Sequence, residues 1–204
     1  MIKPSSMFFE RTKKRSVYNI QPIQNIPSVM EYGILSYKQA EKLRHESIAM
    51  KDVQIRRDKV IIPNGLPLHS YANAYFDPRN PMMYSRQKIA ESLCVLAISS
   101  QVLDFEGTVV SDGNAASSYT RFYSPEEGIE QLDFVRIYSK WWIDEDQYIE
   151  FERKRIKCAE ILVVGSIPFD LVVGACVSTE SGYENLKSSG FDKPIRVTPK
   201  IFFQ

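Results

Sequence analysis

The sequence predicts an α+β fold in which short helices flank a mainly antiparallel central sheet. Apolar runs with strand composition outnumber the runs with helical spacing, and the two kinds do not alternate regularly along the chain. Regular alternation is typical of parallel strands joined by helices, so its absence favours antiparallel pairing. No repeat with a period of roughly 20 to 50 residues and no low-complexity stretch divides the chain. We therefore expect residues 1–204 to form one domain.

Proline, glycine and hydrophobic periodicity set the expected elements of the first half. Asn25 followed by Pro27 favours the start of a helix, and Gly33 favours its end. The basic segment up to Ser16 carries no clear pattern. The sequence then predicts a strand at 17–20, helices at 25–33 and 37–45, a loosely alternating strand-like run at 48–60, a loop at 63–67 and a strand at 71–76.

The second half is richer in apolar runs. Residues 89–99 are apolar enough to be either a buried strand or a helix, and periodicity leaves both open. The other expected elements are strands at 105–110, 134–138, 161–164 and 171–177, helices at 125–131 and 183–187, a polar stretch at 144–157 and a final apolar run at 195–203.

Composition and charge exclude several classes of protein. The chain is 44% hydrophobic and 25% charged, as folded globular proteins are, which excludes disordered, collagenous and coiled-coil chains. Lys and Arg number 26 against 25 Asp and Glu, so the formal net charge is +1. This balance excludes a generally basic protein that coats nucleic acid. Any polyanion must therefore bind through a local patch.

The cysteines and apolar runs indicate the compartment. Cys94, Cys158 and Cys176 are far apart and form no CxxC pair, which argues against a zinc site or a disulfide scaffold and suits a reducing compartment. The N-terminus lacks the pattern of a signal peptide. The most apolar window, 161–177, is short and is interrupted by Pro168 and Asp170. We expect a soluble, cytoplasmic protein.

Common catalytic motifs are absent from the sequence. It contains no dinucleotide-binding glycine fingerprint, no P-loop, no nucleophile elbow and no HExxH zinc motif. The two histidines, His45 and His69, lie beside polar or loop residues, and we expect both to be solvent-exposed. A mechanism centred on a histidine base therefore has little support.

Three segments are unusual for an ordinary core. Arg56 and Arg57 lie within the strand-like run and either face solvent or grip a phosphate. Residues 71–84, YANAYFDPRNPMMY, form either a core strand and turn or an aromatic wall for a flat ring. The basic run 153–157 is typical of a solvated face, but Glu160 follows it at the mouth of an apolar strand. A carboxylate there can stabilise a developing cation or bind a sugar hydroxyl.

Five blocks in order carry a resemblance to a known family. They are YNIQPIQNIPSVMEYGILS (18–36), VQIRRDKV (53–60), YANAYFDPRNPMMY (71–84), SDGNAASSYTRFY (111–123) and CAEILVVGSIPFDL (158–171). The chain resembles the DarT family, the toxins of DarTG toxin-antitoxin systems, over residues 18–177. These are ADP-ribosyltransferases that use NAD to modify bases in single-stranded DNA. The resemblance implies an NAD co-substrate without a metal and a DarG-type macrodomain antitoxin as a partner.

The resemblance also implies the residues of the active site. Glu160 matches the catalytic glutamate, and Arg57 matches the key arginine, with Arg56 as the alternative. The first block carries Asn19 and Gln21 where the family often has His and Thr. The positions implied for NAD binding are Asn19, Gln21, Asn25, Tyr75 and Met82.

The segment before Glu160 corresponds to the loop that reads the target in such transferases. Its aromatic residues suit base stacking, and its basic residues suit phosphate contacts. The positions implied for DNA binding are Arg56, Asn114, Tyr119, Arg121, Trp142, Arg153, Lys154 and Arg155.

The target base and two other functions remain as alternatives. Members that read thymine often have YVPFYF where this chain has YANAYF, so the resemblance favours guanine, with thymine as the second base. A module that binds single-stranded nucleic acid without catalysis is the runner-up function. An RNase-type toxin or a simple interaction domain is the third.

Overall fold

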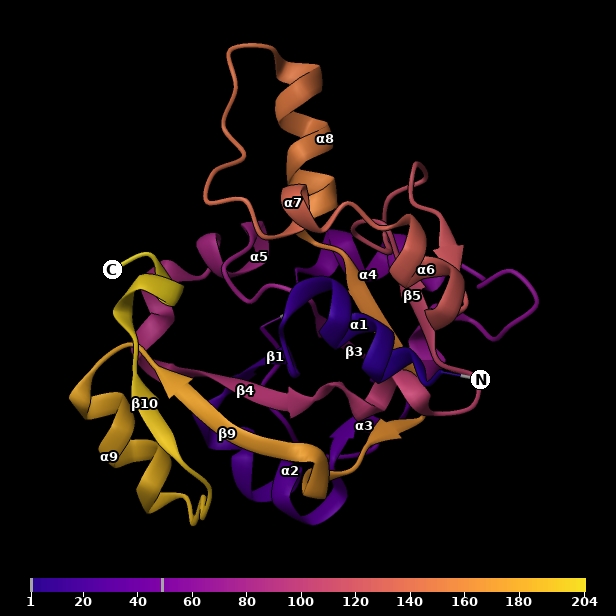
Figure 1. Cartoon of the computed structure of the whole chain (residues 1–204). Coiled ribbons are helices and arrows are strands. Elements are labelled where there is room, and N and C mark those ends of the chain that lie inside the picture. Colours follow the sequence, from indigo (N-terminus) through magenta and orange to yellow (C-terminus); the bar gives the residue numbers. More distant parts are fainter. Residues whose placement is uncertain (1, 49) are drawn as a thin grey trace.

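The computed structural model describes residues 2–48 and 50–204 and contains one large sheet with helices around it (Figure 1). The eight strands of this sheet lie in the order β10-β9-β4-β1-β3-β7-β5-β6, and a second sheet pairs β2 with β8. In the large sheet only β9 and β10 pair in parallel. The α+β fold with a mainly antiparallel sheet is therefore confirmed.

The strands lie at β1 Ser16–Pro22, β2 Ile34–Leu35, β3 Tyr71–Tyr75, β4 Leu93–Ser99, β5 Val109–Ser111, β6 Phe122–Tyr123, β7 Glu160–Val164, β8 Ser166–Ile167, β9 Val172–Val177 and β10 Ile195–Val197. The α-helices lie at α1 Pro4–Thr12, α2 Ile26–Tyr32, α3 Tyr37–Ala40, α4 Lys51–Asp58, α5 Pro81–Tyr84, α6 Pro125–Gln131, α7 Phe134–Ile137, α8 Gln147–Lys157 and α9 Glu180–Ser188. The 3₁₀ helices lie at η1 Ile23–Asn25, η2 Leu68–Ser70, η3 Gln87–Ser92, η4 Ser100–Asp104, η5 Phe169–Leu171 and η6 Pro199–Phe202.

Most elements that were predicted from local chemistry are confirmed. Helix α2 begins just after Asn25, with Pro27 in its first turn, and ends at Gly33, whose φ is +79°. A Cβ at Gly33 would lie 2.5 Å from the carbonyl oxygen of Ile167, so this turn requires glycine on two grounds. The apolar run at 89–99 resolves into the 3₁₀ helix η3 followed by strand β4.

Two predictions of secondary structure are wrong, and a third is wrong in part. The strand-like run at 48–60 contains helix α4, and the predicted strand at 134–138 is the one-turn helix α7. The helix expected at 37–45 ends at Ala40. Both the unpatterned N-terminal segment and the polar stretch before Glu160 contain helices, α1 and α8. In α7 the buried positions, Phe134 and Ile137, are three residues apart, which is a helical spacing that a five-residue window disguises.

Helices cover both faces of the sheet, and one helix projects from the molecule. Phe8 of α1 is fully buried and packs its ring 5.7 Å from the rings of Phe76 and Phe134. Figure 1 shows α8 and the segment before it rising from the body of the molecule. Among the described residues, no helix is both long enough and apolar enough to cross a membrane.

Candidate active site

A cavity of about 400 Å³ lies where the central sheet opens between β1 and β3. Strand β1 pairs with β4 along its whole length but with β3 at Tyr18 and Tyr75 alone. The Asn19 side chain bridges the gap by donating from Nδ2 to the carbonyl oxygen of Asn73 at 2.9 Å. The splayed strands leave room for a ligand between their inner edges.

The strand period of two explains which side chains line this cavity. Tyr71, Asn73 and Tyr75 alternate along β3 and all line the cavity, as do Asn19 and Gln21 on β1. Arg57 lines it from α4. A helix and two strands thus supply polar side chains to one apolar pocket.

Glu160 and Arg57 form a buried ion pair beside the cavity, which Arg57 lines and Glu160 does not. Glu160 is the first residue of β7, pairs in register with Tyr75, and is 1% exposed. The Nη1 atom of Arg57 lies 3.0 Å from both carboxylate oxygens of Glu160. The backbone N–H of Ala115 donates to Glu160 Oε1 at 2.8 Å, and the backbone N–H of Glu160 donates to Ser111 Oγ at 3.0 Å.

Burial and the charge of Glu160 alter the neighbouring titratable groups. Burial lowers the pKa of Arg57, but the charge and hydrogen bond of Glu160 outweigh this effect and hold that pKa above its ordinary value. Burial and then the charge of Glu160 raise the pKa of the Tyr75 hydroxyl, and the same two causes raise the pKa of Cys158 to about 12. Arg57 therefore stays cationic, and the Tyr75 hydroxyl and Cys158 thiol stay protonated at neutral pH.

The structure decides which of the two neighbouring arginines meets the carboxylate. Arg57 is buried and contacts Glu160, whereas Arg56, one residue earlier on α4, is exposed. This difference follows from the helix period, because adjacent residues on a helix point about 100° apart.

The positions implied for NAD binding are brought together. Asn19, Gln21, Asn25, Tyr75 and Met82 all line the cavity. The amide of Asn25 is engaged by both backbone groups of Glu46, at 2.8 and 2.9 Å. In contrast, Asn19 Oδ1 is buried and has no hydrogen-bond partner among the described residues. Asn19 lines the cavity, so this unpaired acceptor lies in the cavity wall.

The positions implied for DNA binding fall into separate groups. Asn114 is half-buried and lines the cavity, while Arg121 is exposed on the following loop. Tyr119 is 71% exposed, and its ring meets that of Phe151 edge-on at 6.0 Å. Phe151 is an exposed residue of α8, and it belongs to the segment before Glu160 whose aromatic residues suit base stacking.

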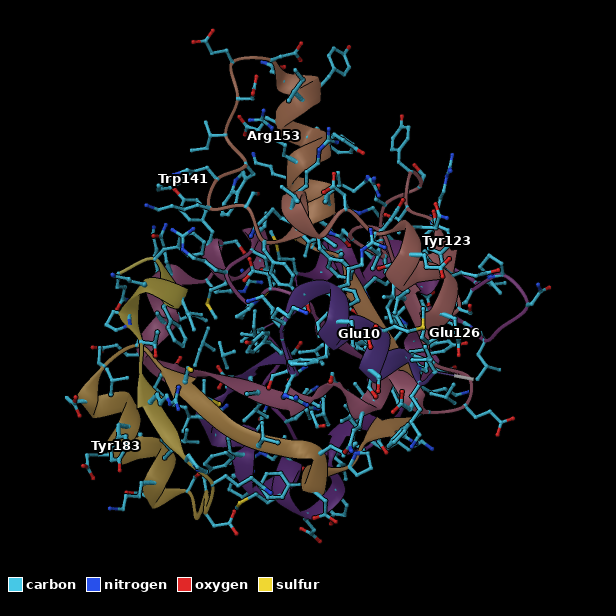
Figure 2. All side chains as sticks on the ribbon, in the orientation of Figure 1. Glu10, Tyr123, Glu126, Trp141, Arg153 and Tyr183 are labelled. Carbon is cyan, nitrogen blue, oxygen red and sulfur yellow. The ribbon has the colours of Figure 1, made fainter. Side chains whose placement is uncertain are left out.

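The structure corrects the expectation for Trp142. Its ring is 6% exposed and packs edge-on against Tyr84 and Phe203, so it belongs to the core. The neighbouring Trp141 is 57% exposed and lies on the projecting segment, where Figure 2 labels it. Sequence alone cannot assign the buried member of such a pair.

The basic run before Glu160 is not a free cationic patch. Arg153 pairs with Asp144 at 2.7 Å and Lys154 pairs with Glu150, although both side chains remain partly exposed. Arg155 is buried in contacts with Asp112, Thr120 and Glu152, and Lys157 is buried against Asp77. The expectation that Arg155 faces DNA is therefore corrected, because its guanidinium is already occupied.

One residue at the site was missed by sequence reasoning. His69 was expected to be solvent-exposed, but it is half-buried, lines the cavity and stacks on Tyr37 with ring centroids 4.3 Å apart. Its Nε2 lies 3.1 Å from Gln54 Oε1, and its Nδ1 lies 3.4 Å from Asp58 Oδ1. The available signal was its position directly before strand β3, which carries Tyr71 and Tyr75 into the cavity.

Among the described residues, no group of three or more His, Cys, Asp or Glu side chains is placed to hold a metal ion. The polar side chains that line the cavity carry amides, hydroxyls, the imidazoles of His45 and His69, the guanidinium groups of Arg57 and Arg86, and the carboxylate of Glu46. These groups suit a polar organic ligand through hydrogen bonds.

The sequence matches characterised relatives along nearly its whole length. The profile of the family described as "ssDNA thymidine ADP-ribosyltransferase, DarT" matches residues 18–203. A protein of Thermus sp. (strain 2.9) described as a DNA ADP-ribosyl transferase is 31% identical over 183 residues, which cover 84% of this chain and 85% of that protein. A fusion of a DNA ADP-ribosyl transferase with a DNA ADP-ribosyl glycohydrolase from Thermosipho africanus (strain H17ap60334) is 28% identical, covering 93% of this chain and 49% of the fusion. The chain thus spans about half the length of that fusion protein.

Solved structures share the fold. Thermosipho africanus DarTG in complex with ADP-ribose superposes with a TM-score of 0.81 at 27% identity, covering 93% of this chain and 51% of that chain. Thermus sp. 2.9 DarT in complex with ADP-ribosylated ssDNA superposes with a TM-score of 0.78 at 26% identity, covering 93% and 97%. Together with the profile match, these likenesses show that the chain belongs to the DarT family.

Proposed function

We propose that this chain is a toxin that transfers ADP-ribose from NAD to a base of single-stranded DNA and releases nicotinamide. The observation that carries the proposal is the buried Glu160–Arg57 pair at a cavity between two splayed strands. A buried carboxylate beside a bound sugar can stabilise the positive charge that develops when the glycosidic bond breaks.

The cavity chemistry fits NAD as the co-substrate. Asn19 Oδ1 is assigned to accept a hydrogen bond from an N–H donor of NAD, because it is the buried acceptor left free in the cavity wall. Tyr75 and Met82 supply apolar surface for the flat nicotinamide ring. Arg57 supplies a fixed cation for a phosphate or for aligning the ribose with its target.

The proposed reaction substitutes one nitrogen for another on the sugar. The bond between ribose C1′ and the nicotinamide nitrogen breaks, and nicotinamide leaves as a neutral ring, so no acid is needed at the leaving group. A bond then forms between C1′ and a nitrogen of the DNA base. Glu160 is assigned to bind the ribose 2′-hydroxyl, to stabilise the sugar cation and to accept the proton that the base nitrogen loses.

The proposed DNA surface combines the 117–121 loop with the exposed part of α8. Tyr119 and Phe151 offer aromatic faces for stacking, and Arg121 offers an exposed cation for the backbone. Arg153 and Lys154 stay candidates in spite of their ion pairs, since both side chains remain about half exposed. The target must be single-stranded, because a base has to leave the stack for its nitrogen to reach the sugar.

Guanine is the proposed base, with thymine as the competing outcome. The proposal rests on Asn19, Gln21 and the YANAYF segment, which depart from the pattern of thymine-reading members. The matching family, in contrast, is described as an ssDNA thymidine ADP-ribosyltransferase, and this description favours thymine. Four oligonucleotides, each containing a single kind of target base, distinguish the outcomes by mass spectrometry.

A DarG-type macrodomain antitoxin is the proposed partner. The Thermosipho africanus relative combines a transferase and a glycohydrolase in one protein. Removal of the transferred ADP-ribose by a co-expressed glycohydrolase should rescue cells that express this chain. Rescue by a glycohydrolase with an inactivated active site would instead indicate inhibition through binding.

The central experiment incubates purified protein with labelled NAD and single-stranded oligonucleotides. We expect the wild-type chain to label DNA and Glu160→Gln, which keeps the volume of the side chain, to lose labelling while still binding DNA. Glu184→Gln is the matched control, because Glu184 is an exposed carboxylate of α9, a helix that lies away from α8 (Figure 1). DNA binding without label transfer by the wild-type protein would reject the enzyme and favour the non-catalytic binding module.

A further inference from the structure

The loop at residues 111–115 holds Glu160 at two points. The backbone N–H of Glu160 donates to Ser111 Oγ at 3.0 Å, and that hydroxyl donates to the carbonyl oxygen of Gly113 at 2.7 Å. The backbone N–H of Ala115 donates to the Glu160 carboxylate at 2.8 Å. The position of the carboxylate therefore depends on the position of this loop.

Arg155 of α8 holds the same loop from the other side. Its Nη1 donates to Asp112 Oδ1 at 2.6 Å, and its carbonyl oxygen accepts from the backbone N–H of Asn114 at 2.9 Å. The Nε and Nη2 atoms form a bidentate contact with Glu152, each at 2.8 Å. The Arg155 side chain is 7% exposed, and of its two carboxylate partners Asp112 (24% exposed) is better shielded from solvent than Glu152 (43% exposed).

Gly113 lets the loop come this close to Arg155. A Cβ on Gly113 would lie 2.5 Å from Nη1 and 2.8 Å from Cγ of Arg155, both shorter than real Cβ contacts. It would also lie 2.9 Å from the Arg155 carbonyl oxygen. At Gly113 the loop therefore packs directly against both the side chain and the backbone carbonyl of Arg155.

From these contacts we infer that Arg155 is a positioning residue for the transfer reaction and not a contact to DNA. It fixes the 111–115 loop, and the loop fixes the catalytic carboxylate of Glu160. The inference rests on the proposed function and deepens it by assigning a residue that acts through others. The planar guanidinium is needed because it binds Asp112 and Glu152 at the same time, which a lysine ammonium cannot do with the same geometry.

Steady-state transfer assays with four variants test the assignment. Arg155→Met removes the side-chain contacts, Arg155→Lys keeps the charge but not the planar guanidinium, and Gly113→Ala keeps every charge but forces the loop away. Arg136→Met is the matched control, because Arg136 is an exposed arginine that pairs with Asp133 on the nearby helix α7. Thermal unfolding identifies any variant that fails to fold.

We expect kcat to fall about 10- to 100-fold in Arg155→Met, Arg155→Lys and Gly113→Ala, with the KM for DNA unchanged, because a displacement of about 1 Å at a catalytic group has effects of this size. Arg136→Met should keep wild-type kcat. A raised KM for DNA with unchanged kcat in Arg155→Met, restored by Arg155→Lys, would overturn the inference and identify Arg155 as a phosphate contact.

Hydrogen exchange gives a readout that does not depend on activity. Amides at 113–116 should exchange faster in Arg155→Met than in the wild type, while those of β4 should not change. Unaltered exchange in a folded variant would count against the coupling. If the wild type transfers nothing, the proposed function fails, but the exchange result still decides whether Arg155 holds the loop.

Discussion

Glu160 and Arg57 are 103 positions apart in the sequence, yet they share one buried contact. Two buried charges are tolerated here because each compensates the other and because Ala115 donates a further hydrogen bond to the carboxylate. Removal of one member leaves the other charged and buried. This contact therefore matters for folding as well as for chemistry.

Arg57→Ala should lower the free energy of unfolding by about 3–5 kcal/mol, the usual cost of leaving one member of a buried ion pair without its partner. Arg56→Ala should change it by about 0.5 kcal/mol or less, because Arg56 is exposed. Urea unfolding of both variants measures the difference. A larger loss of stability in Arg56→Ala would reverse the assignment of the two arginines.

His69 should make stability depend on pH. Burial and then the charge of Arg57 hold the pKa of His69 below its ordinary value, so the unfolded chain binds a proton more readily than the folded one. The contribution of His69 to the free energy of unfolding is fully present above the pKa that His69 has in the unfolded chain. It is lost as the pH falls from that pKa toward the lower pKa in the folded chain. The unfolding midpoint should therefore drop between about pH 7 and pH 5, and it should drop less in His69→Gln. Equal pH profiles for the two proteins would contradict the prediction.

At the scale of elements, α8 and the loop at 111–121 connect the residues proposed to bind DNA with Glu160, the residue proposed for catalysis. The N-terminal part of α8 projects from the body, so its own capping determines its order more than tertiary packing does (Figures 1 and 2). Asp146 caps the helix by accepting from the N–H groups of Tyr148 at 2.8 Å and Ile149 at 3.4 Å.

Asp146→Ala should destabilise the first turn of α8 by about 1 kcal/mol, the usual value for an N-cap. Because this turn lies outside the body, the effect should appear as faster amide exchange at 147–151 and leave the global unfolding midpoint nearly unchanged. The neighbouring Glu145→Ala serves as the control. A lower global unfolding midpoint with unchanged amide exchange at 147–151 would contradict the prediction, because it would show that α8 unfolds only with the whole molecule.

At the scale of the whole molecule, the formal net charge of +1 says how many charges balance but not which of them form ion pairs. The four basic residues of the run before Glu160 all pair with carboxylates, so few cations remain free for phosphate near α8. Binding to single-stranded DNA should therefore depend on stacking and on a small number of exposed cations.

Arg121→Ala should weaken DNA binding at low salt and reduce the slope of log K against log salt by about 0.7, the value for one phosphate contact on a single strand. Tyr119→Ala should cost about 1–3 kcal/mol at every salt concentration, because stacking is not screened. Fluorescence anisotropy with a salt series measures both. An affinity that does not respond to salt in the wild type would exclude a phosphate contact by Arg121.

The sequence by itself determined the features that depend on residues close together in the chain. The α2 boundaries follow from Pro27 and Gly33, and the α+β class follows from the order of the apolar runs. The placement of Glu160 at the start of β7 also follows from the apolar run that it precedes. The resemblance then added Arg57 and the residues of the cavity.

Only the tertiary structure decided which of the aromatic and basic residues that the sequence suggests for DNA binding are accessible to solvent. Trp142 is buried whereas Trp141 is exposed, and Arg155 is occupied whereas Arg121 is free at the surface. The sequence could not determine these outcomes, because burial and ion pairing depend on residues that are distant in the chain. Strand register and helix packing bring those residues together. They pair the basic residues of the run with carboxylates, and one of these residues, Arg155, holds the loop that contacts Glu160.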